Sequence, residues 1–302
     1  MTLGEAAHQH AEGALDRLLL VALTLAVAAG YLLLAARRRH EPRGWSTWRT
    51  GAFLTGSALL VLALLPGLIP YGDDDFRGHM LQHLSIGMLA PLGLVLGAPV
   101  TLLLRSLPAR HGRGIGRVLR SRPAHVIAHP VTALLLNLGG LAALYGTPLY
   151  GATGAHPVLH DLVHVHFLVA GYLFAWVIAG PDPAPRRPSV KARLVILGVA
   201  VAGHAIISQL LYAGLVVHVA VPAEQLHGGA VFMYYGGDIT ELLLAFALVV
   251  TWRPRRPTVA RGAAGSPYDS GRPVVVTGRP PGAKGAGPTA ASRRVAARSS
   301  EG

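Results

Sequence analysis

Two pairs of histidines are the residues of this sequence best suited to metal chemistry. His79 pairs with His83, and His160 pairs with His164, each at a spacing of i, i+4. On a helix such residues share one face about one turn apart, so two imidazoles can close on one metal ion. Each pair stands at the start of a long apolar run. We therefore predict a shared metal or cofactor site to which two helices contribute.

The ligand types narrow the choice of metal. Cysteine is absent from the chain, so disulfides, thiolate ligands and cysteine nucleophiles are excluded. Imidazole and thioether ligands on an oxidising face favour a copper ion, and zinc and iron remain open. The zincin motif His-Glu-x-x-His is absent, and no serine stands in a recognisable nucleophile turn. A haem held by one histidine from each helix is an alternative.

Five further residues are weaker candidates for the same metal site. They are Met80, His166, His204, His227 and Asp238. A methionine is a soft ligand, although within an apolar segment it usually serves packing. His166 is turned away from His160 by roughly 240° on a helix, so we expect it to contact another helix. Asp238, with Glu241 one turn further, could relay protons, balance a bound cation or hydrogen-bond neighbouring helices.

The histidines must be positioned by membrane helices. The 302-residue chain is 52% hydrophobic and only 14% charged, whereas soluble domains carry about 25% charged residues. Several apolar runs reach the ~20 residues that cross a bilayer. We predict an all-α, polytopic membrane helix bundle with about seven transmembrane helices. The predicted spans are 15–36, 50–69, 79–104, 130–150, 157–180, 192–215 and 228–252.

The basic residues predict the orientation of the bundle. Of the 27 Lys and Arg residues, 25 fall in loops 37–49, 105–128 and 181–193 and in the tail 253–302; the exceptions are Arg17 and Arg77. The positive-inside rule then places these loops in the cytoplasm. A short N-terminus, 1–14, lies outside, the membrane domain spans 15–252, and the Gly- and Pro-rich tail is a disordered cytoplasmic extension. The net charge of +13 thus reflects orientation in a lipid bilayer, and we expect no nucleic-acid partner.

Several motifs resemble one known family. Gly78-His-Met-Leu-Gln-His83, Ala90-Pro91 and residues 96–105 are similar to the signature span of the multi-span CtaG-type assembly factors of caa3-type cytochrome c oxidase. Residues 160–167, 171–174 and 180–183 resemble their second signature, and His204-Ala205 and 224–229 resemble later ones. The resemblance covers about 15–252. Glu224 and Leu226 depart from it, since the family pattern has Asp and Gln there.

The resemblance implies a role in building a haem–copper oxidase. It implies a multi-pass protein of the bacterial plasma membrane that binds copper, associates with cytochrome c oxidase subunits and delivers the metal without acting as an enzyme. Two alternatives remain. A membrane copper transporter would extend a path inward through His204, Asp238 and Glu241. A haem- or di-iron-binding oxidoreductase is the other, although di-iron lipid enzymes carry their histidines on the cytoplasmic side.

Overall fold

The computed structural model describes residues 3–42, 44–65, 67–72, 75–185 and 187–252, with side chains from residue 17 onward. These residues belong to one compact unit, Met1–Pro254. They form helices and connecting loops and contain no β-strand, which confirms the all-α prediction for this part of the chain. The predicted tail, 253–302, lies outside the described residues.

The helices follow one another along the chain with short connections. They are α1 (Leu3–Arg39), α2 (Thr47–Leu64), α3 (Phe76–Leu84), the π-helical turn η1 (Ser85–Leu89), α4 (Ala90–Leu96), α5 (Pro99–Ser106), α6 (Ala109–Leu119), α7 (Arg122–Ile127), α8 (Pro130–Gly146), α9 (Leu149–Ala155), α10 (Pro157–Ala179), α11 (Val190–Ala213) and α12 (Ala223–Thr251).

Six of the helical segments are long and apolar enough to cross a membrane. A seventh exists if α8 and α9, which are bent by 76° at their junction, count as one broken span. All seven coincide with predicted spans, but the boundaries differ. α1 already begins at Leu3, and α2 ends at Leu64 rather than at 69. The early end follows from the sequence Leu65-Pro66-Gly67, because a residue before proline avoids the α conformation and Gly67 has φ +75°.

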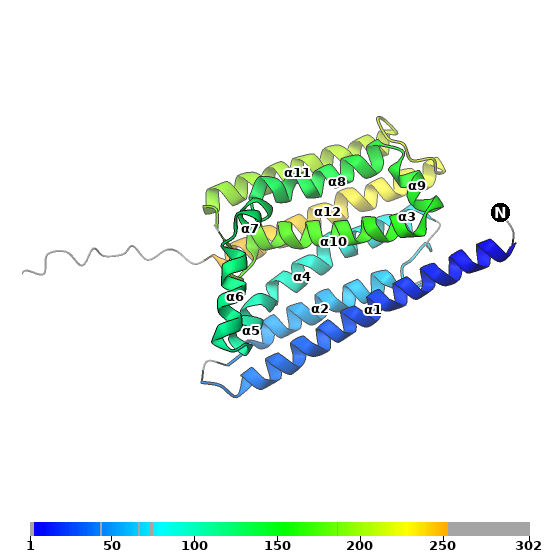
Figure 1. Ribbon diagram of the computed structural model, residues 1–302. Helices are drawn as coiled ribbons and strands as arrows, with labels where there is room; N and C mark the ends of the chain where they lie inside the picture. The colour runs from blue at the N-terminus through cyan, green and yellow to red at the C-terminus, as the bar shows by residue number, and fades with distance from the viewer. Residues whose placement is uncertain (1–2, 43, 66, 73–74, 186, 253–302) are drawn as a thin grey trace, which may run out of the picture. The chain divides into compact units, whose positions relative to one another are not determined.

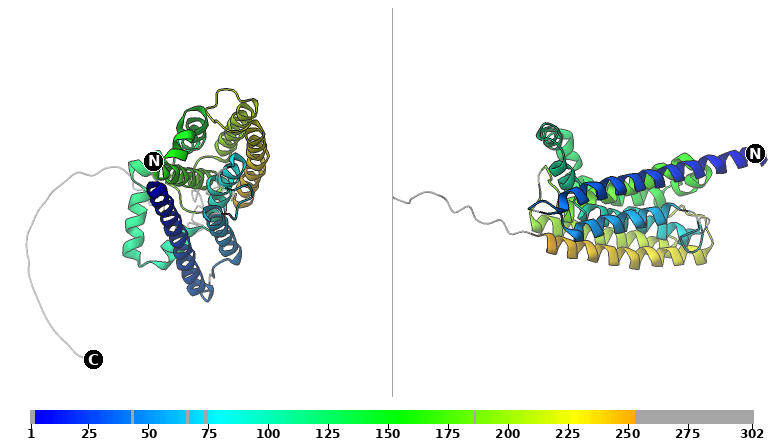
Figure 2. Two further views of the ribbon diagram at one scale, coloured as in Figure 1. Left: turned by 90° about the vertical axis from the view of Figure 1, so that its right-hand side faces the viewer. Right: turned by 90° about the horizontal axis from the view of Figure 1, so that it is seen from below.

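Three spans form the centre of the bundle. The continuous span α3–η1–α4 packs against α10 and α12, while α1 and α2 cover one side and α8 and α11 the other. Figure 1 shows α8 and α11 at the top, the central spans in the middle, and α1 and α2 at the bottom, and Figure 2 shows the same bundle from its end and from below. Within the central group, α3 lies against α12, and η1 and α4 lie against α10.

Small residues in η1 and α10 let these two helices approach each other at the level of their backbones. Pro91 has no N–H, so it cannot bond to the carbonyl of Gly87 in the preceding turn. That carbonyl lies against Gly171 of α10, where any Cβ atom would collide with it. Two glycines thus permit a close helix contact, as small residues commonly do in membranes.

The basic loops gather at one end of the bundle. The α1–α2 and α10–α11 connections and the segment with α5, α6 and α7 lie together at the left of Figure 1. The starts of α3 and α10, together with α9, lie at the opposite end. The helix arrangement therefore agrees with the predicted grouping of the loops, and it places the histidine pairs at the end away from them.

Candidate metal centre

Helix starts position both histidine pairs. The carboxylate of Asp75 caps α3 by accepting a hydrogen bond from the backbone N–H of Arg77. The Arg77 guanidinium bonds the same carboxylate, and this hydrogen bonding holds the pKa of Asp75 below its usual value. Pro157 occupies the first turn of α10, where its missing N–H costs nothing. Each helix then presents its histidines within its first two turns.

The second pair lies on one face of α10, as predicted. The imidazole centroids of His160 and His164 are 4.3 Å apart, and the two rings are nearly perpendicular. His164 is buried and His160 is half-buried. Two imidazoles this close can turn toward a common ligand with small side-chain rotations.

The histidines of the first pair have different surroundings. Nε2 of His79 lies 3.2 Å from the hydroxyl of Tyr145, and its ring packs edge-on against Tyr150. His83 is 4% exposed, and its ring meets Phe167 of α10 at 4.6 Å between centroids. His83 therefore lies directly in the contact between the third span and α10.

The two pairs lie on neighbouring spans. The third span packs against α10 through η1 and α4, and His83 meets Phe167 at this contact. This confirms that the two spans are neighbours, and both pairs lie near the same end of the bundle. Among the described residues, however, no three His, Asp or Glu side chains are arranged to hold one metal ion as they stand. Side-chain rotation would be needed to make a complete coordination sphere from both pairs.

Three of the weaker candidates, Met80, His166 and His227, contact other residues than the four histidines. Met80 is fully buried, and its sulfur accepts a hydrogen bond from the Tyr145 hydroxyl at 3.5 Å. His166 faces α8, where its Nε2 lies 3.1 Å from the carbonyl oxygen of Leu136. His227 is exposed and stacks on Tyr212. This confirms the prediction that His166 points away from the helix face that carries His160 and His164.

His204 of α11 lies in the interior of the bundle. It is 2% exposed, and its Nε2 atom has no hydrogen-bond partner among the described residues. Gly237 of α12 makes room for it, because any Cβ atom there would collide with the imidazole ring. A buried polar atom without a partner is costly, and this ring therefore has an unused ligand position.

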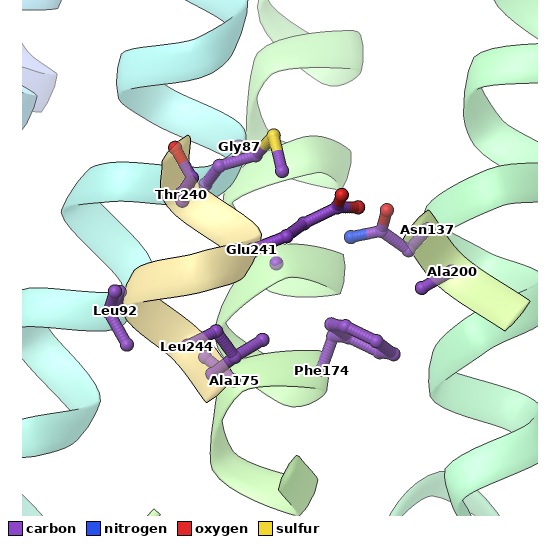
Figure 3. Close-up of a pocket in the computed structure, with 11 residues that line it drawn as sticks. Gly87, Leu92, Asn137, Phe174, Ala175, Ala200, Thr240, Glu241 and Leu244 are labelled. Carbon is purple, nitrogen blue, oxygen red and sulfur yellow. The ribbon is translucent and has the colours of Figure 1, made fainter. Parts of the chain in front are cut away.

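A small cavity lies among the helices beside α12. Figure 3 shows the side chains of Glu241 and Asn137 pointing toward one another across it. Glu241 is 6% exposed, and its Oε2 has no hydrogen-bond partner among the described residues. The cavity volume of about 30 Å³ is enough for a water molecule. Asp238 is half-buried, one turn before Glu241 on α12.

Sequence reasoning missed two polar residues that contact candidate residues. Tyr145 contacts both His79 and Met80 but lies more than sixty positions away in the chain. Asn137 lines the Glu241 cavity from α8. A polar residue inside an apolar run was the available signal in both cases, yet nothing in the sequence shows which helix such a residue faces.

Fold and site together define a class: a helical membrane protein whose interior gathers imidazoles at one end and carboxylates further in. Residues 29–255 match the family model described as cytochrome c oxidase caa3 assembly factor. The chain belongs to this family.

Mycobacterial proteins are among its relatives. An uncharacterized protein of Mycobacterium bovis is 39% identical over 192 residues, which cover 61% of this chain and 28% of the relative. A protein from Mycobacterium leprae is 31% identical over 262 residues, which cover 80% of this chain and 40% of the relative. The chain thus spans less than half the length of these curated relatives. No solved structure matches it.

Proposed function

We propose that this protein assists the assembly of a caa3-type cytochrome c oxidase by binding a copper ion at the four histidines and passing it to an oxidase subunit. Copper is the cargo in this proposal, and the protein is not an enzyme. Family membership supports the assembly role. The placement of two i, i+4 histidine pairs near the same end of two neighbouring spans is the observation that supports a metal.

The environment of the histidines suits a transfer site. His79 and His160 are half-buried, whereas His83 and His164 are buried beneath them. Such a gradient lets an ion enter through an accessible imidazole and bind a deeper one. The four histidines are not arranged in one fixed coordination geometry. Such an arrangement suits a copper ion that has to be released to a partner protein.

The same proposal includes the orientation. The basic end of the bundle faces the cytoplasm under the positive-inside rule, so the N-terminus and the histidine end face outward from a bacterial plasma membrane. In this orientation the histidines lie on the side from which an exposed copper centre of an oxidase subunit would be loaded.

Copper binding by single and double variants tests the proposal. His83→Ala and His160→Ala should each lower the copper bound by purified protein, and the double variant should lose little more. Ligands of one ion are not additive, because losing one weakens the whole site. In cells, each single change should leave oxidase polypeptides present but deficient in copper.

His227→Ala is the matched control, since this exposed histidine lies away from the cluster and should leave copper content unchanged. Additive losses in the double variant would indicate two separate sites. Full copper occupancy in both single variants would refute the metal site and leave the histidines a packing role.

A copper transporter is the second candidate, and the buried polar groups favour it. His204 is buried against Gly237 of α12, and Glu241 and Asn137 line a cavity beside the same helix. Copper accumulation inside vesicles with purified protein would favour transport, whereas binding without accumulation favours assembly. A haem between the third span and α10 is less compatible, because Gly87 and Gly171 bring the two backbones into contact.

A further inference from the structure

A basic pocket lies at the end of the bundle where the basic loops gather. Its lining includes Arg49 of α2, Arg187 of the α10–α11 loop and Arg193 of α11, together with Trp48 and Trp252. We call this the basic pocket. Within the described residues, no carboxylate forms an ion pair with any of the three arginines. The pocket therefore concentrates positive charge.

The arginine charges are deeply placed and incompletely partnered. Arg193 is only 6% exposed; its Nη1 donates to the carbonyl of Ile178, but its Nε has no hydrogen-bond partner. Arg187 donates to the carbonyls of Gly180 and Asp182. A buried guanidinium with an unused N–H is costly unless an anion completes its bonds.

Among the described residues, the carboxylate of Asp182 comes near the arginines of the basic pocket, and its oxygens are already hydrogen-bonded to α5. Asp182 is buried and attracts Arg187 electrostatically. Its two carboxylate oxygens accept hydrogen bonds from the backbone N–H groups of Val100 and Thr101 at the start of α5. This acid therefore caps a helix and does not satisfy the open Nε of Arg193.

An apolar groove continues from the basic pocket along the bundle. It runs between α2 and α12 across α4, and its lining includes Gly51, Leu243 and Phe246. The pocket and the groove share Trp48, Leu96, Val250 and Thr251. A charged site at the helix ends is thus joined to an apolar groove that follows the helix axis. A phospholipid has a matching arrangement, with a charged headgroup followed by apolar acyl chains.

We propose that the basic pocket and the apolar groove form a specific site for one anionic phospholipid. Its phosphate lies among Arg49, Arg187 and Arg193, and an acyl chain lies between α2 and α12. Guanidinium groups bind phosphate through strong charge-assisted hydrogen bonds. Basic pockets between membrane helices bind anionic headgroups in this way, and interfacial tryptophans favour the headgroup level.

Lipid binding by the purified full-length protein tests the site. Native mass spectrometry in detergent should show one phosphatidylglycerol retained in preference to phosphatidylcholine, and phosphatidylglycerol should raise the unfolding temperature. The double variant Arg187→Gln/Arg193→Gln should bind phosphatidylglycerol about a hundredfold more weakly, because each of the two charged hydrogen bonds lost costs about one decade of affinity. Arg113→Gln/Arg117→Gln on α6 removes the same charge outside the pocket and should bind normally.

A groove variant keeps the test decisive if the arginine variant does not fold. Gly51→Leu fills the groove from a position where an added Cβ meets nothing within 4 Å, and it should weaken lipid retention. Gly30→Leu on α1, equally open, is its control. Equal retention of phosphatidylcholine, equal protection by inorganic phosphate, or unchanged binding in Gly51→Leu would each overturn the proposal.

Discussion

At the scale of single residues, glycine determines where an imidazole can lie. Gly140 of α8 makes room for His166, whose Nε2 would lie 2.5 Å from an added Cβ atom. Gly237 does the same for His204, and more tightly. The open ligand position on His204 thus depends on an absent side chain on a neighbouring helix, which no reading of the histidine spacing could indicate.

Gly237→Ala should displace the His204 ring. Overpacking of this kind costs about 1–3 kcal/mol, so the unfolding temperature in detergent should fall. Gly198→Ala on α11 is the matched control, because its Cβ atom would meet nothing within 4 Å. This control should be neutral or stabilise the helix by roughly 0.5–1 kcal/mol. Equal effects of both changes would show that Gly237 and His204 are not in contact.

At the scale of helices, the sequence was sufficient to locate spans but not contacts. Apolar run length located six of the predicted spans, and a seventh if α8 and α9 count as one broken span, since the bilayer fixes how long a crossing must be. The i, i+4 spacing correctly put His160 and His164 on one face. The partners across helices, such as Phe167 for His83, could not be predicted, because they depend on how spans pack and on the rotation of each helix.

The contact between η1 and α10 is the element-level feature that joins the two histidine pairs. Gly171→Ala should force the helices apart, because its Cβ atom would collide with the Gly87 carbonyl, a backbone group that cannot rotate away. We expect lower folded yield and less bound copper per folded molecule.

Gly139→Ala on α8 is the control for this change, since nothing lies within 4 Å of its added Cβ. Unfolding temperature and copper content of both variants provide the measurement. A Gly171→Ala protein as stable as the Gly139→Ala protein would contradict the close contact of the two helices.

At the scale of the whole molecule, the two ends of the bundle differ in charge, because the basic loops gather at one of them. The positive-inside rule predicts that a reporter fused after Trp252 is active only if it functions in the cytoplasm. One inserted at Asp74 should be active only if it functions outside. The two fusions are measured in the same kind of cells. The reverse pattern would place the histidines on the cytoplasmic face, and copper could then not reach an outward-facing oxidase centre by the proposed route.

We expect the bend between α8 and α9 to thin the bilayer that surrounds this part of the bundle. α8 has only 17 residues, or roughly 25 Å at 1.5 Å per residue, while the hydrocarbon core is ~30 Å. A span too short for its membrane is accommodated by local thinning. α8 packs against α10, and its final turn carries Tyr145 to His79. Thinner lipid beside this end would bring the aqueous phase, and a water-exposed domain of an oxidase subunit, closer to the imidazoles.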